Sequence, residues 1–125
     1  MSRGVTKVAE SEVVQMVIGE AAAAIDVATL LLHTARESST AAVSSGRKIT
    51  EAEAVRARRD MVYPQHQVGW ALDRLCEMDG ARWVYDSDAL GAIRRDVMTI
   101  LTHHAASRQA AMAPYGKMLL SQGPG

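Results

Sequence analysis

The sequence has no phenylalanine and a single cysteine, Cys76, among its 125 residues. One thiol forms no internal disulfide and completes no zinc-ribbon spacing, so we expect a reducing, cytoplasmic location. The chain also lacks an excess of charge of either sign, because its 14 Lys and Arg residues balance its 14 Asp and Glu residues. A neutral chain has no broad positive field to attract a phosphate backbone, so we expect no nucleic-acid partner.

Long uninterrupted apolar runs are missing as well. The first ten residues have no apolar core of the kind found in secretory signals. The most apolar stretch, residues 13–32, contains Gln15, Glu20 and Asp26, so a membrane span there would bury two carboxylates without evident partners. We therefore expect a soluble chain with no membrane contact.

Alanine is abundant, with 21 residues, and hydrophobic residues make up 48% of the chain. Alanine is the best helix former, and its small side chain lets helices approach closely. No convincing alternation of period two is present, so the sequence predicts an all-α fold. The length indicates one domain over residues 1–125, ordered over approximately 8–120.

Apolar residues recur at steps of three and four from Val8 to Arg36, which predicts a long amphipathic helix. Ser, Thr and Gly cluster over residues 38–48 and predict a flexible connection. Thr50 and Glu53 fit a capping box that starts a second helix, which runs to Asp79 with Gly80 as its C-terminal cap.

Pro64 lies inside this second pattern, where we expect a bend rather than a stop. A third helix begins after residues 86–88 and lasts to about Met112, before Pro114 interrupts it. The prediction is an antiparallel bundle of three long helices plus a short C-terminal helix. The small-faced first helix suggests contacts between subunits.

The four histidines lack metal-ligand spacings, because no carboxylate precedes any of them by three residues and no His-Glu-x-x-His run occurs, so we expect no metal site. His103 follows Asp96 by seven residues, which places both on one stripe of a helix. His103 is then either a surface or interface group or a functional one. Arg94 and Arg95 either lie on a solvated face of the helix or bind an anionic cofactor.

The order of these features resembles the C-terminal helical domain of the acyl-CoA dehydrogenase fold. The resemblance covers roughly residues 8–120 and lies in Met78-Asp79-Gly80-Ala81, Tyr85-Asp86-Ser87-Asp88-Ala89-Leu90, Ile93-Arg94-Arg95-Asp96, His103 and Tyr115-Gly116-Lys117-Met118-Leu119-Leu120. Within that superfamily, Arg-Asp followed seven residues later by His is most similar to the two-component flavin-dependent monooxygenases. These hydroxylate aromatic or polyketide substrates with reduced flavin from a separate reductase.

The resemblance implies a fragment of a larger flavoenzyme, with an N-terminal helical domain, a middle β domain and subunits that assemble as dimers or tetramers. It implies FMN or FAD, with His103 near flavin and substrate as a general base or orienting donor. Gly80 and Ala81 match the turn that approaches the flavin of an adjacent subunit, and Arg95 and Asp96 support the site.

Two features depart from the family pattern. Arg82 and Trp83 stand where some members have another small residue, and the third helix has no Glu to act as a dehydrogenase base. The alternative is a non-catalytic helical assembly module whose alanine-rich faces associate with themselves or with another chain. The enzyme hypothesis predicts a reading frame that continues upstream of Met1, or a neighbouring chain with the missing domains. The module hypothesis predicts a complete stand-alone gene.

Overall fold

The computed structural model describes residues 11–78, 89–103 and 107–123, and it places four α-helices and no strand in them. The helices are α2 (Glu12–Ser44), α3 (Glu51–Met78), α4 (Ala89–Leu101) and α5 (Arg108–Ser121). This confirms the all-α class. The bundle differs from the predicted one in having two long helices and two short ones.

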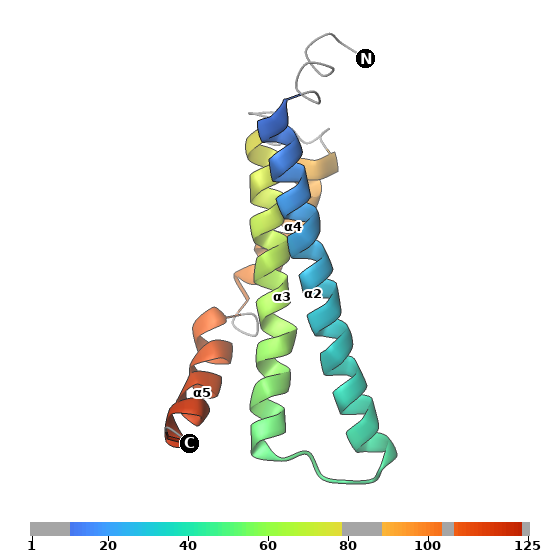
Figure 1. Ribbon diagram of the computed structural model, residues 1–125, viewed down its shortest axis with the longest axis vertical. Coiled ribbons are helices and arrows are strands. Elements are labelled where there is room, and N and C mark those ends of the chain that lie inside the picture. The colour runs from blue at the N-terminus through green and yellow to red at the C-terminus, as the bar shows by residue number, and fades with distance from the viewer. Residues whose placement is uncertain (1–10, 79–88, 104–106, 124–125) are drawn as a thin grey trace.

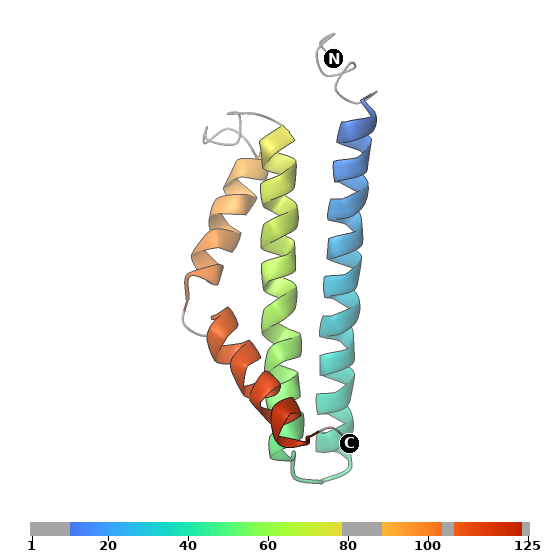
Figure 2. The same cartoon turned by 60° about the vertical axis from the view of Figure 1, so that its left-hand side comes forward.

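Helix α3 is the centre of the arrangement. Among the described helices it alone contacts the other three. α2 lies antiparallel along one side of α3, whereas α4 and α5 lie on another side, α4 beside its C-terminal half and α5 across its N-terminal half (Figures 1 and 2). α2 therefore has one described neighbour, and the rest of its circumference has none.

The contact between α2 and α3 is a narrow seam of small residues on α2. Its buried residues are Val17, Ala21, Ala28, Ala35 and Ala42. The last four repeat every seven residues, which is the 3.5-residue period of a coiled-coil seam. Alanine at these positions lets the two backbones approach closely along most of the helix.

Helix α2 ends at Ser44, eight residues beyond the predicted end at Arg36, so the predicted flexible connection over residues 38–48 was wrong for its first part. Ala42 lies one heptad after Ala35, and both side chains are buried. Their burial against α3 outweighs the weak helix preference of the Ser and Thr residues between them. The Ser45 hydroxyl donates to the Ala42 carbonyl at 2.9 Å and helps to end the helix.

The capping box before α3 is confirmed. The Glu53 amide donates to Thr50 Oγ1 at 3.1 Å, and the Thr50 amide donates to Glu53 Oε1 at 3.2 Å. Arg47 adds two donors to the same carboxylate, at 2.7 and 2.9 Å. Hydrogen bonds from Arg47 and then Thr50 lower the pKa of Glu53 to about 2, so the cap is charged at neutral pH.

Helix α3 continues through the buried Pro64 without interruption, which confirms that this proline does not stop the helix. The predicted end of the helix at Asp79 and its cap, Gly80, lie outside the described residues, and the described part of α3 ends at Met78.

The predicted third helix to Met112 was wrong, because the chain forms two helices there. α4 ends at Leu101, and α5 starts after Ser107, whose hydroxyl accepts from the Ala110 amide at 3.3 Å. This N-cap restarts a helix that continues through Pro114, the residue at which we expected helix to stop. Separate helices let the two segments pack on different parts of α3 (Figure 2).

Glycine allows α4 to lie close against α3. A Cβ at Gly69 would be 2.6 Å from Leu101 Cδ1 and 3.9 Å from Val97 Cγ1. Any side chain at this position would have to displace the terminal methyl group of Leu101, so glycine lets Leu101 of α4 pack directly on the α3 backbone.

Two arginines connect the outer helices to α3. Arg94 of α4 donates through Nε to Asp73 Oδ1 at 2.7 Å. Arg59 of α3 lies 4.0 Å over the ring of Tyr115 of α5, and its guanidinium also donates to the buried Asp60. Arg59 therefore contributes to the packing of α5 on α3 and is not simply solvated.

Candidate functional site

Helix α4 positions three of the residues that the sequence proposed for the site. Arg94 faces α3 and pairs with Asp73, so it contributes to packing between helices. Arg95 is half-buried, whereas Asp96 is exposed. The two neighbours thus leave α4 in different directions, as the 100° step of a helix requires.

The outward face of α4 is partly apolar. Ile93 and Ile100 are 52% and 54% exposed, and Asp96 lies between them at helical spacing. An isoleucine on each side of a carboxylate makes an exposed apolar strip with one charged hydrogen-bond acceptor. Such a face fits one wall of a site for a planar ring, with Asp96 available to accept an N–H.

His103 lies beyond the end of α4, so the predicted helical stripe that joins it to Asp96 was wrong. Its amide donates to the Ile100 carbonyl at 3.0 Å, which closes a tight turn, and its side chain is exposed. The turn keeps His103 at the same end of α4 as Ile100. The cofactor-binding residues proposed from the sequence at the preceding turn, Gly80 and Ala81, lie outside the described residues.

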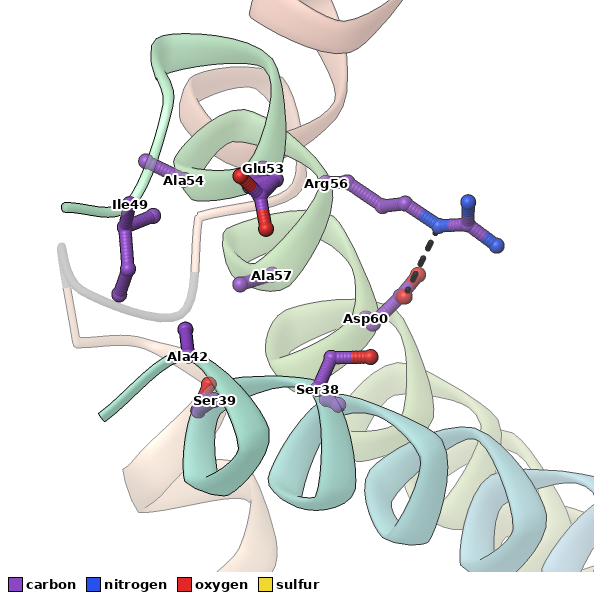
Figure 3. A pocket seen from close by; sticks show the side chains of 10 residues that line it. Ser38, Ser39, Ala42, Ile49, Glu53, Ala54, Arg56, Ala57 and Asp60 are labelled. Atoms are coloured by element: carbon purple, nitrogen blue, oxygen red, sulfur yellow. Dashed lines mark ion pairs between the residues drawn. The ribbon is translucent and has the colours of Figure 1, made fainter. Parts of the chain in front are cut away.

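A hollow of about 320 Å³ lies elsewhere, between the end of α2 and the start of α3 (Figure 3). Ser38 points across it toward the ion pair of Arg56 and Asp60. The Asp60 side chain is only 3% exposed, and Arg59 Nη2 lies 2.7 Å from its Oδ1 and Arg56 Nε 3.8 Å from its Oδ2. This buried carboxylate was not predicted from the sequence, although the four-residue spacing of Arg56 and Asp60 indicates an ion pair on one helix.

The polar residues of this hollow stabilise the packing and the start of the helices, and they do not form a reactive centre. Its second carboxylate, Glu53, accepts from Arg47 and from the start of α3. Asp60 is held by arginines on its own helix. In the part of the chain that the structure describes, no three His, Cys, Asp or Glu side chains gather as a metal site would need.

Helix α2 is long and apolar enough to cross a membrane by length and composition alone, with a mean hydropathy of 1.6 over its most apolar window. Only 17% of that window is buried within the chain. Glu20, in the N-terminal third of this helix, lies 3.9 Å from Arg74 of α3, so its carboxylate is directed to another helix. The buried seam against α3 explains part of the apolar character of α2.

Residues 2–108 match the family model described as acyl-CoA dehydrogenase, C-terminal domain. The match includes α2, α3 and α4 and stops at the first residue of α5. No curated protein and no solved structure is similar enough to match. Domains of this family typically oligomerise and sit with other domains of a flavoprotein that generally binds FAD. With most of its length matched, the chain belongs to the acyl-CoA dehydrogenase C-terminal domain family.

Proposed function

We propose that the chain is the C-terminal domain of a two-component flavin-dependent monooxygenase that hydroxylates an aromatic or polyketide-like substrate in the cytoplasm. The family match supports a flavoprotein domain. The order Arg95, Asp96 and then His103 supports the monooxygenase branch, because acyl-CoA dehydrogenases use a carboxylate base and this segment has no Glu.

The observation that carries the proposal is the outward face of α4. Ile93 and Ile100 expose half of their surface on either side of Asp96. Covering this apolar area would contribute about 25 cal/mol per Å². A flavin or substrate ring held by the remaining domains, or by an adjacent subunit, is a suitable cover, so the chain supplies one wall of a shared pocket.

Reduced FMN or FAD, delivered by a separate reductase, would supply the electrons that dioxygen chemistry needs. His103 holds or accepts the proton of a substrate hydroxyl, because imidazole changes charge near neutral pH. Asp96 accepts a hydrogen bond from the ring, and Arg95 supports it from the half-buried side of α4. We assign Gly80 and Ala81 to contact with the flavin of an adjacent subunit in the proposed dimer or tetramer, as the family resemblance implies. The isoleucines and the other domains exclude water.

The substitution His103→Ala in the complete enzyme tests this role. We expect hydroxylation to fall by about 10²-fold or more, the usual contribution of a positioned acid or base. The affinity for reduced flavin, measured by anaerobic calorimetric titration, should change little. His33→Ala, an exposed histidine on α2, is the matched control. Hydroxylation by His103→Ala at the level of that control would refute the assignment.

A non-catalytic assembly module is the second candidate, and the apolar outer surface of α2 favours it. Exposed residues there include Val13, Met16, Ile18, Ile25, Val27, Leu30 and Leu32. Anaerobic titration of the 125-residue chain, alone and with the flavoenzyme domains supplied, separates the candidates. Saturable binding of reduced FMN or FAD in either mixture supports the enzyme. Self-association without flavin binding in both supports the module.

A further inference from the structure

A second hollow, distinct from the face of α4, is lined by residues of α2, α3 and α5. It has a volume of about 340 Å³ and is lined by Ala24, Tyr63, His66, Gln67, Trp70 and Arg108. This volume is at the lower end for small-molecule pockets, which run from about 300 to 1,000 Å³. It has room for a molecule of one or two rings.

The walls of the hollow are aromatic. Tyr63 and Trp70 are seven residues apart, so two turns of α3 place both rings on the same side of the helix. They are 42% and 46% exposed, a large apolar area to leave uncovered. Arg74 lies over the Trp70 ring at 5.9 Å and helps to hold it in place. Two aromatic side chains on one stripe of a rigid helix favour a flat, aromatic ligand.

The charge in the hollow is positive. Arg108, the first residue of α5, is the cation that lines it, and no lining residue is a carboxylate. Within the described ranges, Arg108 makes no ion pair, unlike Arg59 and Arg94, which have acidic partners. A guanidinium without a carboxylate partner in its own chain is able to bind a ligand carboxylate through two parallel hydrogen bonds, in bidentate geometry.

Gln67 adds a polar group between the two rings. Its Oε1 is buried and accepts no hydrogen bond within the described part of the chain. A buried acceptor left without a donor costs about 1–3 kcal/mol. Because this oxygen is shielded from solvent, a ligand would reach it after a rotation of the Gln67 amide, and an O–H or N–H on the ligand would then satisfy it.

We propose that this hollow binds an aromatic acid, with its ring between Tyr63 and Trp70, its carboxylate on Arg108 and a ring hydroxyl or amino group on Gln67. The site is independent of the proposed flavin chemistry, since none of its lining residues belongs to α4 and it needs no cofactor. The result of its binding test therefore does not depend on whether His103 has the proposed catalytic role.

The test uses the 125-residue chain, 4-hydroxybenzoate as the probe, and the indole N–H signal of Trp70 in NMR spectra, with Trp83→Phe to assign it. We expect a saturable shift of that signal. Phenol, which lacks the carboxylate, and cyclohexanecarboxylate, which lacks the aromatic ring, should each bind about tenfold more weakly or worse. No saturable shift up to roughly 10 mM, or binding of either partial ligand as tight as that of 4-hydroxybenzoate, would overturn the proposal.

Variants test the individual contacts. Arg108→Ala should weaken 4-hydroxybenzoate binding by about tenfold, the size of one lost charged contact. Gln67→Leu should also weaken it but leave the thermal midpoint unchanged or higher, because it removes an unpaired buried oxygen. Arg58→Ala, an exposed arginine of α3 that does not line the hollow, is the matched control. Binding by Arg108→Ala equal to this control would overturn the site.

Discussion

At the scale of single residues, the burial of an ion pair determines how much it contributes to the free energy of unfolding. Asp60 and Asp73 both lie on α3, and each has an arginine nitrogen 2.7 Å from its Oδ1. They differ in burial, since the Asp60 side chain is 3% exposed and that of Asp73 is 40% exposed. Equal distances in such different surroundings separate the effect of burial from that of geometry.

The Asp60→Asn substitution should lower the free energy of unfolding by about 3 kcal/mol, because it leaves Arg59 next to a buried group that no longer neutralises it. It should also loosen α5, since Arg59 stacks on Tyr115. Asp73→Asn is the matched control and should cost no more than about 1 kcal/mol, as expected for a partly exposed pair. Urea unfolding followed by circular dichroism measures both. Equal losses would show that burial does not set the value of the Asp60 pair.

At the scale of helices, the closeness of α3 and α4 depends on a missing side chain. A methyl group at Gly69 would meet Leu101 at 2.6 Å, whereas a methyl group at Gly19 of α2 would meet nothing within 4 Å. Both glycines lie inside helices, so both gain helix propensity on substitution by alanine.

A double-mutant cycle separates propensity from packing. Gly19→Ala should stabilise the chain by about 1 kcal/mol with or without Leu101→Ala. Gly69→Ala should be neutral or destabilising alone and stabilising by about 1 kcal/mol with Leu101→Ala, a coupling of the size found for residues in contact. Thermal or urea unfolding measures the four free energies of each cycle. The same effect at Gly69 as at Gly19 would contradict the close approach.

Some helix boundaries are determined by residues close in sequence, and others by packing against distant parts of the chain. The start of α3 follows from a capping box that Thr50 and Glu53 form within four residues. The end of α2 depends on the burial of Ala35 and Ala42 against a helix that comes later in the chain. The break between α4 and α5 had a local signal in Ser107, whose N-cap bond restarts the helix, but the proline further on suggested a different boundary.

At the scale of the molecule, the chain has more apolar surface than its own helices cover. Ile18, Ile25 and Leu32 form a heptad-spaced stripe on α2 beside the seam with α3, and all three are exposed. Family membership gives a reason, since such domains typically oligomerise and sit with other domains. We expect this stripe to be covered by another subunit or domain.

The double substitution Ile18→Glu and Ile25→Glu should reduce self-association, because it places two carboxylates in the apolar stripe. Light scattering after size-exclusion chromatography should report a smaller assembly at the same concentration, with unchanged helicity by circular dichroism. The control, Gly19→Glu with Thr40→Glu, adds the same charge to exposed positions of α2 away from that stripe. An unchanged mass for the stripe variant, or an equal loss in the control, would show that the stripe is not the contact.

The sequence by itself determined what depends on neighbours along the chain. Those features are the all-α class, the capping box at Thr50, the passage of α3 through Pro64 and the order of Arg95, Asp96 and His103. Tertiary structure decided what depends on residues far apart. It extended α2 through Ala42, paired Arg94 with Asp73, stacked Arg59 on Tyr115 and brought Arg108 to the aromatic residues of α3. The physical reason is that hydrogen bonds of caps and turns join residues a few positions apart, whereas burial and ion pairing are set by which surfaces meet after the helices pack.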